Sequence, residues 1–380
     1  MADSICAITM PKWGLSMDEG TVAEWKLHPG DAVKKGDEIV YIETSKIAGA
    51  LESPAAGLFR RQVAAVGATL PVGALLGVLA DASTSDAAID AFVEDFTKNF
   101  VPEAVGESDT ARGPSTVTIG EFTIAYTKIS ARTPGTAAPA VFVHGFGGDS
   151  TGWALNLDAL AADRDVFAVD LPGHGQSTKN AGSGLISDFA SVLNDWCAAA
   201  GIARAHWIGH SFGAAVILAL ALEHSARVAS LAMLGPAGLG DFINQDYIDR
   251  FVAAERRKDM QAALELLFAD SGRVTRNLVE ETLKYKRIDG VGDALRTIAA
   301  AAFHNGKQSL HFRDRVSKIA VPMLCIWGAA DSIVSPSDAK GLPAAVKAHV
   351  LDNTGHMPQI EAASEVNALL REHLRTGDPR

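Results

Sequence analysis

The hydrophobic positions of the chain follow two patterns, which change near residue 115. Residues 1–80 contain short apolar runs, such as residues 21–25, separated by turns rich in glycine and proline. Short strands at such close spacing predict a small all-β domain, a β-sandwich or flattened barrel. In residues 115–380, apolar strands alternate with segments of helical periodicity, which predicts a parallel sheet with helices on both faces. The pattern therefore predicts two folded domains joined by residues 81–114.

The connecting segment differs from both domains in its charge. Residues 81–110 contain eight acidic residues and one lysine, so that seven of the eleven net negative charges of the chain lie here. We interpret residues 81–114 as an acidic linker with one amphipathic helix, whose apolar positions are Ile89, Phe92, Val93, Phe96 and Phe100. Packing of these side chains on the following domain is the favoured interpretation, and docking to a partner enzyme is the alternative.

An insertion interrupts the alternation of strands and helices in the large domain. Several consecutive helical segments occupy residues 236–305, between strands predicted at residues 228–234 and 323–327. In parallel sheets of this type, functional groups gather beyond the carboxyl ends of the strands. We therefore look for chemistry in the residues that directly follow each predicted strand.

Composition excludes several classes of partner and setting. The net charge of −11 argues against nucleic acid or an anionic membrane surface as a general partner. No run of eighteen apolar residues predicts a membrane span. The three cysteines, Cys6, Cys197 and Cys325, lie far apart and show no metal-binding spacing. We expect no metal, and a reducing cytoplasm is the simplest setting.

The strongest candidate for chemistry is the sequence from Gly209 to Gly213, a G-x-S-x-G motif centred on Ser211. An apolar strand, residues 205–208, precedes it, and a helical run of small residues follows it. A strand, a sharp turn and a helix form the context in which such a serine is an exposed nucleophile. In a chain with 35 glycines the motif alone would be weak, so partners for the serine are needed.

Two such partners follow later strands, in the order Ser, Asp, His. Asp331 comes directly after the strand at residues 323–327, and His356 follows the strand at residues 348–351. A nucleophilic serine needs a base that accepts its proton, and the base needs a carboxylate that fixes its tautomer. We predict that Ser211, Asp331 and His356 form a catalytic triad. His210 is excluded, because its side chain should point elsewhere in such a turn.

These motifs resemble those of the α/β-hydrolases. The sequence from His144 to Gly148 is similar to the oxyanion-hole loop of that family, which implies that the backbone N–H groups of Phe146 and Phe212 hold the oxyanion. The segment around His174 is also typical of the family, and we interpret that histidine as structural. The resemblance implies an α/β-hydrolase fold in which residues 236–305 form a helical lid.

A lysine between two predicted strands gives the small domain its own candidate site. Lys46 lies in the sequence Glu43-Thr44-Ser45-Lys46, preceded by Gly30-Asp31 and Gly36-Asp37 and followed by Ser53-Pro54. In order and spacing these residues resemble a lipoyl domain of the barrel-sandwich type. The resemblance implies that Lys46 carries lipoate in an amide bond. A biotin domain is the rival, but the methionines that usually flank its lysine are absent here.

A lipoyl domain joined to an α/β-hydrolase domain resembles the acyltransferase components of acetoin dehydrogenase systems. That resemblance implies a thiamine-diphosphate-dependent acetoin dehydrogenase component and dihydrolipoyl dehydrogenase as partners, coenzyme A as the acetyl acceptor, and a homo-oligomer. Ordinary lipoyl acyltransferases carry a His-x-x-x-Asp-Gly motif. Here Asp289-Gly290 is preceded by Tyr285 at the matching position, so that chemistry is unavailable.

Three functions remain open at this point. In the first, Ser211 takes acetyl from the lipoyl arm on Lys46 and passes it to coenzyme A. In the second, the large domain is a serine esterase, a thioesterase or a C–C bond hydrolase, and water is the acceptor. In the third, the large domain is mainly an assembly scaffold, although a scaffold has no need of Ser211, Asp331 and His356.

Overall fold

The computed structural model describes residues 5–13, 17–44, 48–101, 114–133 and 135–378. The chain divides into two compact units, residues 1–113 and 114–380. Each unit is described by itself below. Among the described residues, no helix is both long enough and apolar enough to cross a membrane.

The first unit is built from two four-stranded antiparallel sheets. One sheet has the order β1 (Cys6–Thr9), β8 (Leu75–Ala80), β6 (Gly57–Gln62) and β3 (Ala32–Val33). The other has the order β5 (Ala48–Glu52), β4 (Glu38–Glu43), β2 (Glu19–Trp25) and β7 (Thr69–Pro71). Alternate side chains of both sheets, such as Val22, Ile42 and Phe59, form one buried core.

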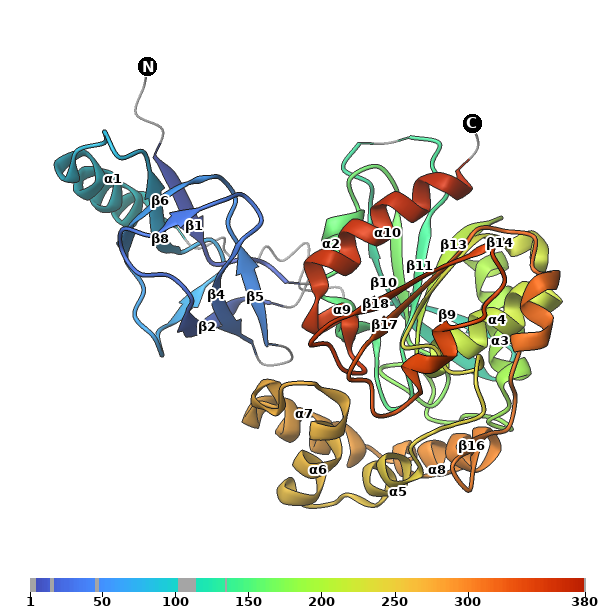
Figure 1. Cartoon of the computed structure of the whole chain (residues 1–380). Helices are drawn as coiled ribbons and strands as arrows, with labels where there is room; N and C mark the ends of the chain where they lie inside the picture. The colour runs from blue at the N-terminus through green and yellow to red at the C-terminus, as the bar shows by residue number, and fades with distance from the viewer. Residues whose placement is uncertain (1–4, 14–16, 45–47, 102–113, 134, 379–380) are drawn as a thin grey trace. The chain divides into compact units, whose positions relative to one another are not determined.

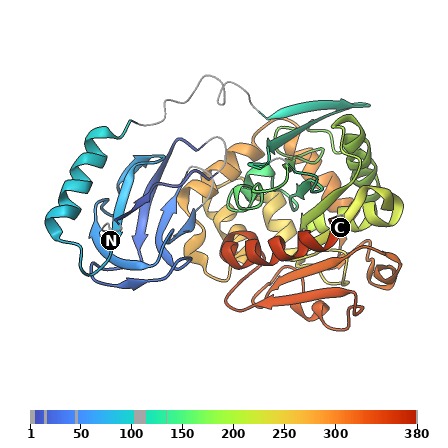
Figure 2. The ribbon, with the colours of Figure 1, turned by 90° about the horizontal axis from the view of Figure 1, so that it is seen from above.

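Helix α1 (Asp86–Asn99) packs on the first unit, so the expectation that its apolar face covers the following domain was wrong (Figures 1 and 2). Ile89 is fully buried against Val78 and its neighbours on β8. All six residues of β8 are buried, because one face of this strand lies in the core and the other lies under α1. An ion pair of 2.8 Å between Arg60 and Asp86 ties the first turn of the helix to β6.

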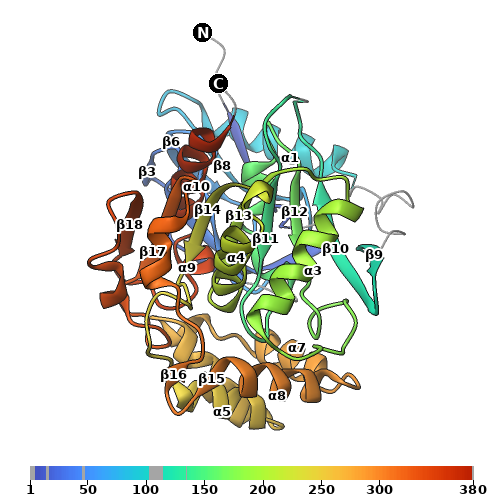
Figure 3. The ribbon, with the colours of Figure 1, turned by 90° about the vertical axis from the view of Figure 1, so that its right-hand side faces the viewer.

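The second unit contains an eight-stranded sheet, in which β12, β11, β13, β14, β17 and β18 are parallel neighbours and β10 joins antiparallel to β12 (Figure 3). The strands are β9 (Ser115–Ile119), β10 (Phe122–Ile129), β11 (Ala140–Val143), β12 (Val166–Val169), β13 (Ala205–His210), β14 (Val228–Leu234), β17 (Met323–Gly328) and β18 (Val346–Leu351). The central strands β11, β12, β13 and β14 are buried along their whole length and mostly apolar, because helices cover both faces of the sheet.

The helices that cover the sheet form two layers. Helices α3 (Ile186–Ala199) and α4 (Phe212–Glu223) share one core with the sheet, while α2 (Leu157–Leu160) and α10 (Ala363–Gly377) share the other (Figures 1 and 3). The short helix α9 (Pro358–Glu361) precedes α10. Helix α4 is buried from Phe212 to Ala221, which explains its run of small and aliphatic residues.

A helical insertion connects β14 to β17, as the pattern of residues 236–305 predicted. It consists of α5 (Gln245–Ala253), α6 (Arg257–Leu264), α7 (Arg276–Lys286), α8 (Val291–Ala302) and the hairpin of β15 (Phe303–His304) and β16 (Lys307–Gln308). A short 3-10 helix, η3 (Glu265–Leu267), follows α6. The helices gather beyond one end of the sheet (Figures 1 and 3).

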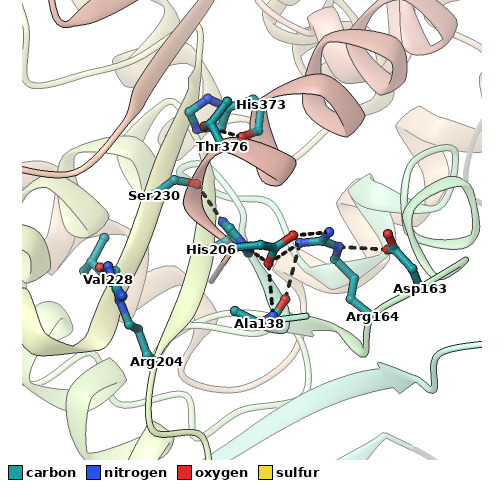
Figure 4. A network of polar contacts seen from close by, with 10 residues as sticks. Ala138, Asp163, Arg164, Arg204, His206, Val228, Ser230, His373 and Thr376 are labelled. Carbon is teal, nitrogen blue, oxygen red and sulfur yellow. Dashed lines mark hydrogen bonds and ion pairs between the residues drawn. The ribbon is translucent and has the colours of Figure 1, made fainter. Parts of the chain in front are cut away.

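A buried polar network closes the other end of β13 (Figure 4). Asp378, just after α10, accepts hydrogen bonds from Arg164 at 2.8 Å and from His206 at 3.0 Å. His206 also contacts the hydroxyl of Ser230 at 2.8 Å. Arg164 is only 3% exposed, and its buried charge is paired with this carboxylate and with that of Asp163, 3.0 Å from its Nε. Burial acts to raise the pKa of Asp378, but the bonds from His206 and Arg164 outweigh it and lower that pKa.

Candidate active site

Ser211 occupies a sharp turn between β13 and α4, with φ of 51° and ψ of −117°. A positive φ is unusual for serine and is held only by tight surroundings. The flanking glycines show how tight they are. A Cβ at Gly209 would lie 2.7 Å from the backbone nitrogen of Ala214, and one at Gly213 would lie 2.4 Å from the carbonyl oxygen of Val143. The motif therefore needs glycine at both positions.

The structure brings Ser211, His356 and Asp331 together. His356 Nε2 lies 2.9 Å from Ser211 Oγ, and its Nδ1 lies 2.8 Å from Asp331 Oδ2. The second carboxylate oxygen, Oδ1, accepts the backbone N–H groups of Ile333 at 2.8 Å and Val334 at 3.1 Å. All three side chains belong to buried residues. This is the geometry in which a carboxylate fixes the tautomer of a base and the base can take a proton from a hydroxyl.

The loop that follows β11 lies directly against the serine. A Cβ at Gly145 would be 3.1 Å from Ser211 Cβ, and the loop closes in a turn from Gly148 N–H to the carbonyl of Gly145 at 3.1 Å. Within the described part of the chain, the backbone N–H groups of Phe146 and Phe212 donate to no protein acceptor. Free backbone N–H groups are what an oxyanion hole requires.

Neutral histidines hold this loop in place. His174 Nε2 accepts the N–H of Gly147 at 3.2 Å, and His144 Nε2 accepts the N–H of Leu171 at 3.0 Å. Burial and the neighbouring His144 lower the pKa of His174 well below its usual value. A protonated ring could not accept these bonds, so the neutral form fits the structure. His174 therefore supports the loop and does not contact Ser211.

His210 also serves the site from outside the triad. Its Nε2 lies 2.7 Å from the carbonyl oxygen of His356, so it donates to that backbone group. Burial, together with the nearby His356, lowers the pKa of His210 to about 3.

Aromatic side chains of the helical insertion cover the loop. Phe146 packs against Phe251 and Phe303, each with ring centroids 5.9 Å apart. Gly147, at φ of 72°, approaches Phe251 so closely that a Cβ would lie 2.3 Å from the phenyl ring. The insertion therefore contacts the loop beside Ser211 through apolar surface.

Sequence reasoning missed Glu361, whose carboxylate bonds to the loop around His356. A single glutamate in an apolar stretch gives no signal for this role. Lys46 lies outside the described residues. The strands on either side of it, β4 and β5, pair antiparallel as a hairpin, and Glu43 opposite Ala48 is the pair nearest to the lysine. That hairpin is compatible with an attached lipoyl group. No group of three or more potential metal ligands exists among the described residues.

Comparison with known proteins first defines the class. Residues 139–363 match the family described as "alpha/beta hydrolase fold", and residues 7–79 match the one described as "Biotin-requiring enzyme". A meta-cleavage product hydrolase from Pseudomonas fluorescens shares the fold, with a TM-score of 0.59 and 21% identity over 69% of this chain and 97% of that one. The chain thus belongs to the alpha/beta hydrolase fold family and carries a domain of the biotin and lipoyl type.

Relatives along the whole chain narrow the family further. The chain is 40% identical over 374 residues to the dihydrolipoyllysine-residue acetyltransferase component of the acetoin cleaving system of Cupriavidus necator, covering 98% of both chains. It is 42% identical to the component of the same name from Pseudomonas putida, covering 97% of this chain and 99% of that one. The chain belongs to this family of acetyltransferase components. The fold and the family resemblance expected from the sequence are confirmed.

Proposed function

We propose that this chain transfers an acetyl group from a lipoyl arm on Lys46 to coenzyme A, and that Ser211 carries the group in between. The observation that supports it best is the pair of contacts that link Ser211 to His356 at 2.9 Å and His356 to Asp331 at 2.8 Å. The chain that holds them belongs to a family of acetyltransferase components. A lipoate amide on Lys46 would supply the acetyl group as a thioester. Ser211 then takes up the acetyl group, His356 moves the protons, and backbone N–H groups hold the oxyanion.

In the first half-reaction, Ser211 Oγ attacks the thioester carbonyl while His356 Nε2 takes the hydroxyl proton. The N–H groups of Phe146 and Phe212 hold the negative oxygen of the tetrahedral intermediate. The C–S bond then breaks, and the leaving thiolate receives the proton from His356. Asp331 stabilises the imidazolium throughout. The product is an acetyl ester on Ser211.

In the second half-reaction, His356 takes the proton of the coenzyme A thiol as the sulfur attacks the ester. The same two N–H groups hold the second oxyanion. The C–O bond breaks, Ser211 Oγ recovers its proton from His356, and acetyl-coenzyme A leaves. Water must be kept from the ester during this step. The buried triad and the aromatic cover from Phe146 and Phe251 support such exclusion.

Product analysis tests the proposal against hydrolysis. The lipoylated chain is incubated with acetyl-dihydrolipoamide, with and without coenzyme A, and both acetate and acetyl-coenzyme A are followed. We expect acetyl-coenzyme A to dominate when coenzyme A is present. Acetate as the main product under both conditions would make the chain a hydrolase. Ser211→Ala should abolish transfer, whereas Ser191→Ala, at an exposed hydroxyl on α3, should not.

The proposed role also includes partners. Membership in an acetoin cleaving system means that other enzymes of the system act with this component. We propose that a thiamine-diphosphate-dependent component loads the arm, that dihydrolipoyl dehydrogenase reoxidises it, that the chain forms a homo-oligomer, and that it works in the cytoplasm. Intact mass measured after expression with lipoate checks the attachment: the lipoyl increment should appear in the native chain and be absent from Lys46→Ala.

A further inference from the structure

The helical insertion binds the backbone of the proposed base directly. The N–H of His356 donates to the carbonyl oxygen of Leu267, in η3, at 2.7 Å. In the loop that carries Asp331, the hydroxyl of Ser332 donates to the carbonyl oxygen of Leu266 at 2.8 Å. Residues 266–269 of the insertion therefore run along the two loops that carry Asp331 and His356.

One buried carboxylate joins the same two parts of the unit. Glu361, 8% exposed at the end of α9, accepts the N–H of Gly355 at 2.8 Å and of Met357 at 3.3 Å with Oε1. Its Oε2 accepts the N–H of Ala269 at 2.8 Å. The carboxylate thus binds both neighbours of His356 and, at the same time, the insertion.

The contact between loop and insertion is also close in space. A Cβ at Gly355 would lie 2.6 Å from the nitrogen of Ala269 and 2.8 Å from the carbonyl oxygen of Leu267. Only glycine allows the two backbones to approach in this way. The loop therefore has little freedom to move while the insertion stays in place.

We propose that Glu361 is a positioning residue that couples the helical insertion to His356, so that the imidazole reaches Ser211 only while residues 266–269 are bound. This inference rests on the proposed role of Ser211 and His356. The physical reason is that three N–H donors converge on one group, and only an ionised carboxylate offers acceptors alone on both oxygens. The amide of a glutamine at position 361 has only one oxygen. Its NH₂ group would face either Ala269 N–H or the N–H groups of Gly355 and Met357, so one of these contacts would be lost.

The effect on His356 can be measured without coenzyme A or a lipoyl arm. An alkyl fluorophosphonate reacts with an activated serine: the Oγ–P bond forms, His356 takes the proton and fluoride leaves. We expect Glu361→Gln in the full chain to lower the second-order rate of inactivation about 10- to 100-fold, since a displacement near 1 Å costs on that order. Glu365→Gln, an exposed carboxylate in the first turn of α10, is the matched control.

A second variant breaks the bridge from the side of the insertion, by replacing a donor with a carbon atom. Ala269→Pro deletes the N–H that Glu361 Oε2 accepts. Ala269 is exposed, and Phe268 before it is extended with φ of −114° and ψ of 144°, as a residue before proline should be. If both substitutions act by breaking the same contact, their effects should not add. The double variant should then be inactivated at a rate within about twofold of the slower single variant. Should Glu361→Gln not fold, Ala269→Pro decides alone.

The outcomes are distinct. Slower inactivation in both variants, measured well below their melting temperatures, together with faster amide hydrogen exchange in residues 266–269 and 354–357, supports the coupling. Rates within twofold of the native chain, or equal effects of Glu361→Gln and Glu365→Gln, overturn it. If the native chain is not labelled at Ser211, the proposed function fails, and hydrogen exchange still decides whether Glu361 holds loop and insertion together.

Discussion

Asp331→Asn is the sharpest test of how the carboxylate works. Because Oδ1 accepts two backbone N–H groups, from Ile333 and Val334, the amide of the variant must keep its oxygen there. Its NH₂ group then takes the place of Oδ2, 2.8 Å from His356 Nδ1. A donor at this place forces the proton from Nδ1 to Nε2, which faces Ser211. The imidazole can then no longer accept the proton of the hydroxyl.

The expected loss follows from that change of tautomer. Replacing a triad aspartate by asparagine lowers kcat about 10⁴-fold, which at about 1.36 kcal/mol per tenfold corresponds to about 5.4 kcal/mol in the barrier. Single-turnover transfer from acetyl-dihydrolipoamide to coenzyme A is the assay. Asp352→Asn, an exposed aspartate after β18, should behave like the native chain. A rate for Asp331→Asn above a tenth of the native rate would refute the role assigned to this carboxylate.

Three further predictions concern the surroundings of the site and the first unit. Gly147→Ala, whose Cβ would lie 2.3 Å from Phe251, should lower kcat about 10- to 100-fold by moving the loop; unchanged kinetics would show that the loop adapts. Since burial lowers the pKa of His210 to about 3 from about 6.5 in the unfolded chain, the unfolded state binds the proton first. As the pH is lowered from about 6 to about 4, the free energy of unfolding should therefore decrease. In denaturant titrations, His210→Asn should reduce this pH dependence by about 1.4 kcal/mol per pH unit. Ile89→Ala, fully buried under α1, should cost the first unit about 2–5 kcal/mol, seen as faster hydrogen exchange in β8; native exchange there would show that α1 contributes little.

The sequence allowed good prediction of the residues at strand ends. Ser211, Asp331 and His356 each follow an apolar run, and parallel strands bring their carboxyl ends to one edge of a sheet. Their meeting at 2.9 and 2.8 Å therefore follows from topology. The sharp turn at Ser211 was recognisable because neighbouring backbone atoms leave no space for a side chain at Gly209 and Gly213, and both glycines belong to the local motif.

Contacts that depend on distant backbone were not predictable. The periodicity of α1 indicated an apolar face but not which surface buries it. The signal for the answer lay in β8, whose apolar residues occupy both faces of the strand. Glu361 was hidden because its partners are backbone N–H groups, one of them 92 positions away in Ala269. Such donors leave no mark in the sequence.

The network around Asp378 has a consequence for the order in which the second unit can be completed during synthesis. The carboxylate that neutralises the buried Arg164 lies 214 positions later in the chain. At about 5–20 residues per second, a ribosome needs roughly 10–40 s to make that stretch. During this time the arginine can pair only with the largely exposed carboxylate of its neighbour Asp163 and must stay hydrated, so the first strands of the sheet can pair but the end of the sheet at Arg164 cannot close. Closure of this end of the sheet therefore waits for residue 378, and a nascent chain stalled before that residue should hold an open, protease-sensitive edge.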